Sequence, residues 1–296
     1  SAFFGMIGMG VGAVLNIALD PLFIFVLDMG VSGAALATIL SQIVSFCLLL
    51  RGCTRGGNIA ISLKNFSPSW ARYKEIARGG TPSLFRQGLG SVATICLNFA
   101  AGIYGDAAIA GMSIVTRVLQ FANSAIIGLG QGFQPVCGFN YGAKLWQRVL
   151  DTLKWASITG VCIGGAFFLI AEAIPAPIVE LFGVSGDLEN FAVYALRVYV
   201  IFFAPVGFQI VGSSYFQSSG QPMKAAILEL TRQVLFLIPL YLLLPPVLTA
   251  LFGTTGLEGV IISAPVSDAL SVCVTSVFVA REVRKLRRLR DSGGIA

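Results

Sequence analysis

The segment GAALATILSQIVSFCLLL, residues 33–50, is largely apolar and contains no charged side chain. A helix rises about 1.5 Å per residue, so a segment of this length can cross a hydrocarbon layer of about 30 Å. Seven further apolar stretches lie along the chain, at residues 3–27, 82–104, 107–130, 149–175, 191–217, 225–252 and 260–279. The sequence therefore predicts an all-α, polytopic membrane helix bundle with eight transmembrane helices.

The positive charges agree with this pattern, because nearly all Lys and Arg residues lie in alternate loops. They are concentrated in residues 51–80, 144–154 and 281–290 and at Lys224, whereas the intervening loops contain mainly Asp and Glu. Cytoplasmic loops of membrane proteins carry an excess of Lys and Arg. We therefore expect a multi-pass protein of the cytoplasmic membrane, with both ends of this chain on the cytoplasmic side.

The predicted organisation has four parts. Residues 1–50 form two helices, residues 51–80 a cytoplasmic linker, residues 81–280 a six-helix bundle and residues 281–296 a basic tail. Within the linker, Ser67 and Pro68 are typical of a helix start, and Gly79-Gly80 is predicted to end that helix. Apolar residues recur between them at helical spacing, which indicates a short amphipathic helix on the membrane surface.

Composition excludes several classes of function. Hydrophobic residues make up 56% of the chain and charged residues only 11%, too apolar for an ordinary soluble domain. The net charge of +6 lies next to helix ends, where it suits anionic lipid headgroups, so we expect a lipid bilayer and no nucleic acid as partner. There is no His, no CxxC spacing and no phosphate-binding or nucleophile motif. We predict no enzyme activity, no metal site and no cofactor.

One polar group inside the first apolar stretch stands out. Asp20 and Asn16 are four residues apart and share a helix face. Pro21 follows and leaves the carbonyl of Ile17 without its helical donor. Ionisable groups in membrane helices are costly, so each is a candidate site. A carboxylate, an amide and a free carbonyl on one face predict an ion-coupling site for a proton or a small cation, although an Asp that only satisfies the proline kink is the alternative.

Other polar residues are candidates for a substrate cavity. Arg117 lies near the middle of its stretch, with Gln120 on the same face, and Asp268 is a possible ion-pair partner of Arg117 across the bundle. Arg232 has Glu229 three residues earlier and is close enough to a helix end to extend to the interface instead. The remaining candidates for a water-filled cavity are Gln87, Asn98, Gln209 and Gln233.

A weak internal repeat accompanies these features. Gly30-Val-Ser-Gly33 and Gly253-Thr-Thr-Gly256 both open an apolar helix after a proline-containing one, at an offset of 223 residues (253 − 30). Two complete units would have 446 residues (2 × 223), about 150 more than this chain. Parallel repeats are common in transporters. The spacing predicts that the chain contains the end of one repeat unit and all of a second.

At this point the sequence resembles a known family. Asn16-Ile-Ala-Leu-Asp20-Pro21-Leu-Phe-Ile-Phe25 and Met29-Gly-Val-Ser-Gly-Ala-Ala-Leu-Ala-Thr38 resemble the fifth and sixth helices of multidrug and toxic compound extrusion (MATE) transporters. Tyr104-Gly-Asp-Ala-Ala-Ile-Ala110 and Gly130-Gln-Gly-Phe-Gln-Pro135 are similar to the seventh and eighth, and Gln217-Ser-Ser-Gly-Gln-Pro222 to the tenth. These segments are most similar to the Gram-positive multidrug efflux branch of the family.

The resemblance implies twelve helices in two six-helix lobes around a central cavity, of which this chain would supply helices 5–12. It implies a secondary antiporter of the bacterial cytoplasmic membrane that exports cationic amphipathic drugs in exchange for H⁺ or Na⁺. Asn16 and Asp20 fall on the coupling positions of the N-terminal lobe, and the missing N-terminal helices would be their partners. The seventh helix departs from the family pattern, because it has Arg86-Gln87 and no carboxylate.

Two rival functions remain open from the sequence. A lipid-linked oligosaccharide flippase of the same superfamily would need phosphate-binding arginines, and Arg86, Arg117 and Arg232 grouped on one cavity would favour it. Deep acidic groups, with those arginines paired or extended to the interface, would favour drug export. A membrane-embedded enzyme is the third hypothesis, and a buried Ser or Cys beside a base would support it.

Overall fold

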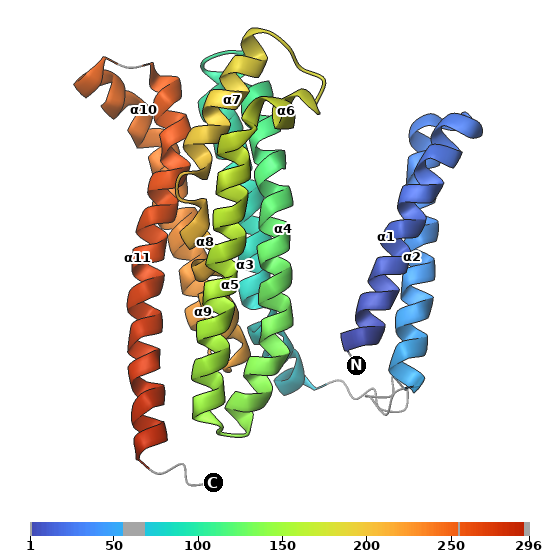
Figure 1. Ribbon diagram of the computed structural model, residues 1–296, viewed down its shortest axis with the longest axis vertical. Coiled ribbons are helices and arrows are strands. Elements are labelled where there is room, and N and C mark those ends of the chain that lie inside the picture. The colour runs from blue at the N-terminus through green and yellow to red at the C-terminus, as the bar shows by residue number, and fades with distance from the viewer. Residues whose placement is uncertain (1, 56–68, 254, 293–296) are drawn as a thin grey trace. The chain divides into compact units, whose positions relative to one another are not determined.

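The structure is a computed structural model that describes residues 2–55, 69–253 and 255–292. Every regular element in these ranges is a helix, which confirms the all-α class (Figure 1). The helices form two compact units, residues 1–70 and residues 71–296. The predicted start of the linker helix at Ser67-Pro68 lies outside the described residues.

The first unit is a helical hairpin. It consists of α1 (Ala2–Pro21), the π-helix η1 (Leu22–Val26) and α2 (Gly30–Arg55). Gly8 and Gly12 allow the two helices to approach closely, because a Cβ on Gly12 would lie 2.8 Å from the Cβ of Ser45. The hydroxyl of Ser45 donates a hydrogen bond of 2.9 Å to the carbonyl of Gly8. Small residues on α1 therefore bring a polar face of α2 against it.

The second unit is the larger helix bundle (Figure 1). It contains α3 (Trp70–Gly102), α4 (Asp106–Gly142), α5 (Trp146–Ala173), α6 (Pro175–Glu180), α7 (Asp187–Val200), α8 (Phe203–Ser218), α9 (Pro222–Leu230), η3 (Thr231–Leu237), α10 (Ile238–Phe252) and α11 (Gly256–Asp291). Glycines again allow close packing, since Gly207 of α8 lies directly against the backbone of Gly160 in α5.

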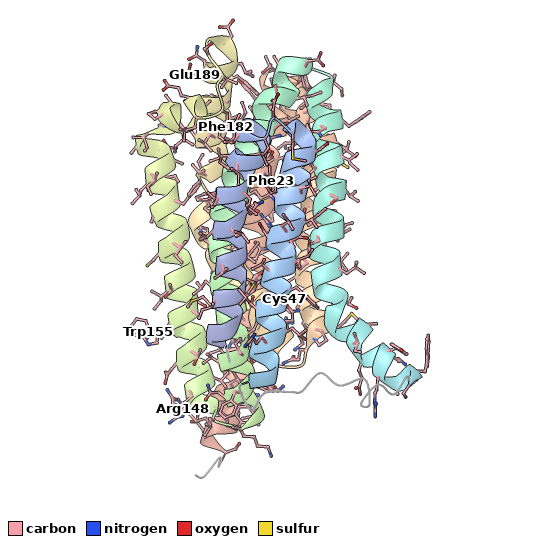
Figure 2. The ribbon with its side chains drawn as sticks, turned by 90° about the vertical axis from the view of Figure 1, so that its right-hand side faces the viewer. Phe23, Cys47, Arg148, Trp155, Phe182 and Glu189 are labelled. Carbon is pink, nitrogen blue, oxygen red and sulfur yellow. The ribbon has the colours of Figure 1, made fainter. Side chains whose placement is uncertain are left out.

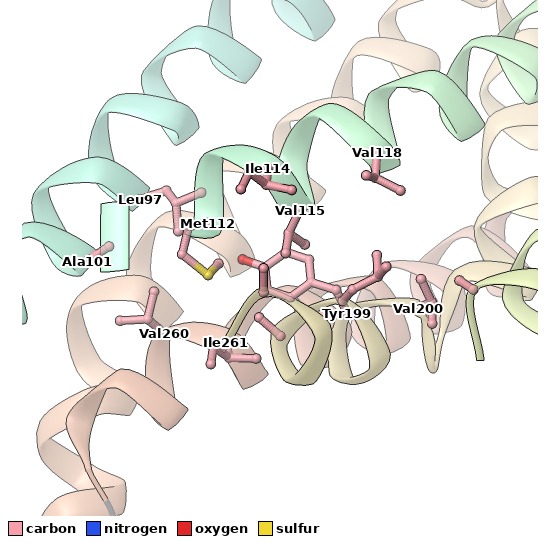
Figure 3. Packing of buried hydrophobic residues seen from close by; sticks show 14 of the residues in the cluster. Leu97, Ala101, Met112, Ile114, Val115, Val118, Tyr199, Val200, Val260 and Ile261 are labelled. Carbon is pink, nitrogen blue, oxygen red and sulfur yellow. The ribbon is translucent and has the colours of Figure 1, made fainter. Parts of the chain in front are cut away.

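The main apolar core of the bundle joins α3, α4, α7 and α11. Figure 3 shows Met112 and Val115 of α4 next to the ring of Tyr199 from α7, with Ile261 of α11 on the other side. Met112 and Val115 are fully buried. Because these residues come from segments far apart in the chain, this core fixes how the later helices are placed around the polar residues between them.

Six helical segments of the described chain are long and apolar enough to cross a membrane, and a bent pair would make seven. The predicted stretch 191–217 is that pair: α7 and α8 meet at 53° around residues 201–202. Pro205 follows this break within the first turn of α8, where proline is tolerated. Helix α3 is not among the six, because Arg86, Gln87 and Asn98 make it less apolar. The predicted count of eight is therefore not reached by this measure.

Two predicted boundaries are not seen as breaks. Helix α3 continues through Gly79 and Gly80, so a separate surface helix does not end there. Helix α11 continues to Asp291, so the described part of the basic tail is a helical extension.

Gly30 and Gly253, the first residues of the predicted repeat, both have positive φ, 53° and 63°. Glycine adopts this conformation without strain, which explains its presence at both helix junctions.

Candidate functional site

The first candidate site lies in the α1/α2 hairpin. The amide nitrogen of Asn16 donates a hydrogen bond of 3.3 Å to a carboxylate oxygen of Asp20, and both side chains are half-buried. The predicted i, i+4 contact is therefore present. Pro21 ends α1 immediately afterwards, and η1 begins with the i→i−5 pattern, as in the bond from Leu27 N to Leu22 O. Such π segments inside helices are frequent at functional sites.

A groove of about 240 Å³ between α1 and α2 begins next to Asn16. From α2 it is lined by four polar residues, Thr38, Ser41, Gln42 and Ser45, and from α1 by Met9, Gly12, Ala13 and Asn16. The hydroxyls of Thr38 and Ser41 donate to the backbone carbonyls four residues earlier. Their oxygens still have lone pairs to accept a proton donor or a hard cation. We call these eight residues the hairpin groove.

The polar residues of α2 are not among the site residues predicted from the sequence. They recur at positions 38, 41, 42 and 45, which is the helical spacing of one face. That periodicity was the signal available, but uncharged Ser and Thr are also common as simple packing residues in membrane helices. Asn16, opposite them in the groove, shows that this polar face of α2 lies against the predicted coupling residue.

The second candidate site is a buried polar network in the bundle. Arg232 Nε lies 2.9 Å from a carboxylate oxygen of Asp268, and the hydroxyl of Ser267 donates to the Arg232 carbonyl at 3.1 Å. Nearby in the fold, Ser213 Oγ donates a hydrogen bond of 3.0 Å to the carboxylate of Glu229. Arg232 belongs to η3, the π-helix before Pro239. Helices α8, α9, η3 and α11 therefore contribute together to this network.

Several polar atoms beside this network lack protein partners among the described residues. The side-chain carbonyls of Gln209 and Gln233 are buried and accept no hydrogen bond there. The hydroxyls of Ser271 and Thr275 on α11 are also buried and make no hydrogen bond with a described residue. Unpaired buried polar atoms are costly unless water, an ion or a substrate supplies the partner. This part of the bundle is therefore suited to a hydrated polar ligand.

The structure corrects two predictions about ion pairs. Asp268 pairs with Arg232 rather than with Arg117, which is exposed on α4 and has no ion pair with a described residue. Arg232 extends to Asp268 of α11 rather than to the interface, while Glu229 acts electrostatically on the same guanidinium, as its spacing predicts. The reason is the packing of η3 on α11, which brings residues 36 positions apart into contact.

The other predicted cavity residues divide into two groups. Gln209 and Gln233 are buried, at 4% and 9% exposure, next to the polar network. Gln87 and Asn98 of α3 and Arg117 and Gln120 of α4 are exposed on the surface of the bundle. The structure does not bring these four exposed residues into contact with the network. The candidates therefore form two groups, an interior site with Gln209 and Gln233 and an exposed polar face with the other four.

Comparison with known proteins identifies the family. The MatE family model matches residues 82–243, more than half of the chain. The chain belongs to the MatE family. This confirms the MATE resemblance found in the sequence, and the MatE segment covers the bundle from α3 into α10, including η3 with Arg232.

Two curated relatives of this MatE-family chain come from staphylococci. It is 28% identical to the multidrug export protein MepA of Staphylococcus haemolyticus over 252 residues, 85% of this chain and 54% of the relative. It is 27% identical to MepA of Staphylococcus saprophyticus over 275 residues, 93% of this chain and 59% of the relative. The chain therefore spans little more than half the length of these relatives.

Solved structures share the fold. An outward-facing multidrug resistance MATE transporter of the MOP superfamily matches 96% of this chain with a TM-score of 0.85 and 26% identity. A MOP superfamily transporter from Pyrococcus furiosus, described as having a binding pocket of reverse polarity that suggests a different function, gives a TM-score of 0.85 and 27% identity. In both cases the match covers 63% of the other chain.

Proposed function

We propose that this chain is the C-terminal part of a secondary antiporter that exports cationic amphipathic drugs in exchange for H⁺ or Na⁺. In this proposal it supplies helices 5–12 of a twelve-helix, two-lobe transporter of the bacterial cytoplasmic membrane. The family membership supports the transporter class, and the names of the staphylococcal relatives support multidrug export. The chain covers 59% of one of these relatives, and the internal repeat predicts a further part of about 150 residues before it.

The observation that carries the proposal is the hydrogen-bonded pair Asn16–Asp20 beside the hairpin groove. A carboxylate in a membrane helix is costly unless it binds a proton or a cation in part of the cycle. The hydroxyl and amide oxygens of the hairpin groove are ligands suited to a proton donor or to Na⁺. Pro21 and η1 interrupt the regular helix next to this pair. Binding of an ion at Asp20 can therefore change the bend of the helix at this interruption.

The drug itself would contact the exposed polar face of the bundle. Gln87, Asn98, Arg117 and Gln120 lie on α3 and α4, with large exposed apolar side chains such as Phe99 and Phe121 beside them. A surface with both properties suits an amphipathic compound, since apolar contacts supply affinity and a few polar groups fix orientation. In the proposed transporter this face lines the central cavity.

The polar network favours drug export over the flippase alternative. A carrier of phosphorylated lipid would need free arginines grouped on one cavity, whereas Arg232 is paired with Asp268 at 2.9 Å inside the bundle and Arg117 lies apart from it on an exposed face. Glu229 adds a second buried carboxylate close to the same guanidinium, so the network has one cation and two potential anions. A site with a net negative formal charge attracts cations and disfavours phosphates.

A test of the proposal compares compounds of opposite charge. In bacteria that lack their own efflux pumps, expression of the full-length protein should raise the inhibitory concentration of a quaternary ammonium compound several-fold. An anionic amphiphile of similar size should be as toxic as in cells with an empty vector. Equal protection against both compounds, or none against the cation at normal expression, would contradict the proposal. Rescue of a strain that lacks a lipid-linked oligosaccharide flippase would support the rival function.

A further inference from the structure

A groove of about 400 Å³ lies between α5 and α11, at the end of the bundle where α5 begins and α11 ends. Its walls are one face of each helix, and Phe208 of α8 contributes to it from behind. A hydrogen bond of 2.9 Å from Arg290 Nη1 to the side-chain oxygen of Gln147 joins the two helices at the outer end. This α5/α11 groove is distinct from the hairpin groove and from the polar network, and neither candidate site uses its residues.

The α5/α11 groove changes character along its length. At the outer end it is lined by Gln147, Arg287 and Arg290, and deeper in the bundle by Ile158, Phe208 and Val279. Val279 and Arg290 are eleven residues apart on one helix, a distance of about 16 Å along the axis. The change from charged to apolar therefore runs parallel to the helices, in the direction in which a phospholipid passes from headgroup to acyl chain.

The charge of the α5/α11 groove is positive. Lys154, Arg287 and Arg290 line the groove together with one carboxylate, Asp151, so the formal charge is +2 (3 − 1) for the lining residues and +1 (3 − 2) when Asp291, the partner of Arg290, is included. Gln147 donates hydrogen bonds of 3.0 and 3.1 Å to the two oxygens of Asp151. Arg290 pairs with Asp291 at 2.9 Å. Within the described chain, Lys154 and Arg287 have no carboxylate in ion-pair contact, so these two cations remain available to an anion.

Aromatic placement agrees with a membrane interface at this level. The ammonium of Lys154 lies 5.7 Å from the centre of the Trp155 ring, and Trp155 is 63% exposed. Figure 2 shows Trp155 projecting outward from α5, with Arg148 near the end of the same helix. Exposed Trp residues are enriched at the headgroup level of bilayers, and basic pockets between helices on the cytoplasmic side bind anionic lipid headgroups.

We propose that the α5/α11 groove binds one anionic glycerophospholipid, with its phosphate between Lys154 and Arg287 and one acyl chain along Val283, Val279 and Phe208. An inorganic phosphate would use only the charged end, and an acidic peptide would leave the apolar end without a partner. A phospholipid satisfies both ends at once. The proposal requires only that this bundle lies in a membrane with its basic end at a lipid surface, and it does not depend on the transported substrate.

The test is lipid binding to the purified full-length protein, measured by native mass spectrometry during titration with phosphatidylglycerol. Each cation near an anionic surface contributes about fivefold to binding. The double variant Lys154→Gln/Arg287→Gln should therefore raise the apparent Kd of the tightest phosphatidylglycerol site roughly 25-fold. The matched control Arg284→Gln/Arg288→Gln removes the same charge from exposed positions of α11 outside the groove. This control should change the Kd by less than about threefold.

The acyl-chain part has its own variant. Ser157→Trp keeps every charge but fills the groove near its apolar end, and it should also remove the tight site. Ser157→Ala leaves the space open and should bind like the parent, which distinguishes filling from loss of the hydroxyl. Glycerol 3-phosphate should not compete with phosphatidylglycerol at equal concentration. Equal weakening by both arginine-containing double variants, tight binding by Ser157→Trp, or effective competition by glycerol 3-phosphate would each overturn the proposal.

Discussion

Asp20→Asn in the proposed antiporter should reduce gradient-driven efflux to the level of vesicles without protein. Asn has nearly the same size and can still accept the hydrogen bond from Asn16, which is 3.3 Å long in the parent. It cannot release or bind a proton, and as a neutral group it attracts a cation only weakly. Exchange is coupled only if the two states of the carrier bind the ion with different affinity. Removal of the charged group should therefore stop transport while folding and membrane insertion remain normal.

Two control variants make this result specific. Asp28→Asn removes a carboxylate from the turn between η1 and α2, outside the hairpin groove, and should transport at the parent rate. Asn16→Ala removes only the amide that orients Asp20, so it should weaken transport less than Asp20→Asn. Transport at the parent rate by Asp20→Asn under an imposed pH or Na⁺ gradient would show that this carboxylate does not carry the coupling ion. Asp268 would then be the next candidate.

Arg232→Gln should produce the largest loss of stability among the single variants considered. Arg232 and Asp268 are largely buried, with side-chain exposures of 22% and 12%, and their ion pair is 2.9 Å long. Loss of one partner leaves a buried charge without compensation, at a cost of about 3 kcal/mol for a pair with some solvent access. The midpoint of thermal unfolding in detergent should fall by several degrees.

The double variant separates the ion pair from general packing. Arg232→Gln/Asp268→Asn removes both charges and should recover much of the lost stability, because no unpaired charge remains. The exposed pair Arg197–Glu172, at 3.7 Å and with exposures of 52% and 36%, is the matched comparison. Arg197→Gln should lower the stability by less than about 1 kcal/mol. A similar loss for Arg232→Gln and Arg197→Gln, or a double variant less stable than either single one, would contradict the role assigned to this pair.

The sequence predicted those features that depend on neighbours in the chain. The spacing of Asn16 and Asp20 placed them on one helix face, and the structure has the hydrogen bond between them. Helical periodicity determines such contacts directly, so they can be inferred without knowledge of the tertiary structure.

Contacts between distant segments were not predictable in the same way. The sequence suggested Arg117 as the partner of Asp268, but the register of η3 against α11 brings Arg232 there instead. The two glycines at positions 79 and 80 predicted a helix end, because glycine has a low helix propensity. Helix α3 nevertheless continues through them, since tertiary packing can override that propensity. The α5/α11 groove depends on residues from three helices, and no single periodic pattern in the sequence indicates it.

The most direct test of coupled exchange uses vesicles that contain the full-length transporter and a fluorescent lipophilic cation, with pH and Na⁺ gradients imposed one at a time. We predict that one gradient alone drives the cation against its own concentration difference, and that Asp20→Asn removes this movement under the same gradient. The account would be contradicted if the cation moved at the same rate under a pH gradient, under a Na⁺ gradient and without any gradient. It would also be contradicted if Asp20→Asn moved the cation at that same rate.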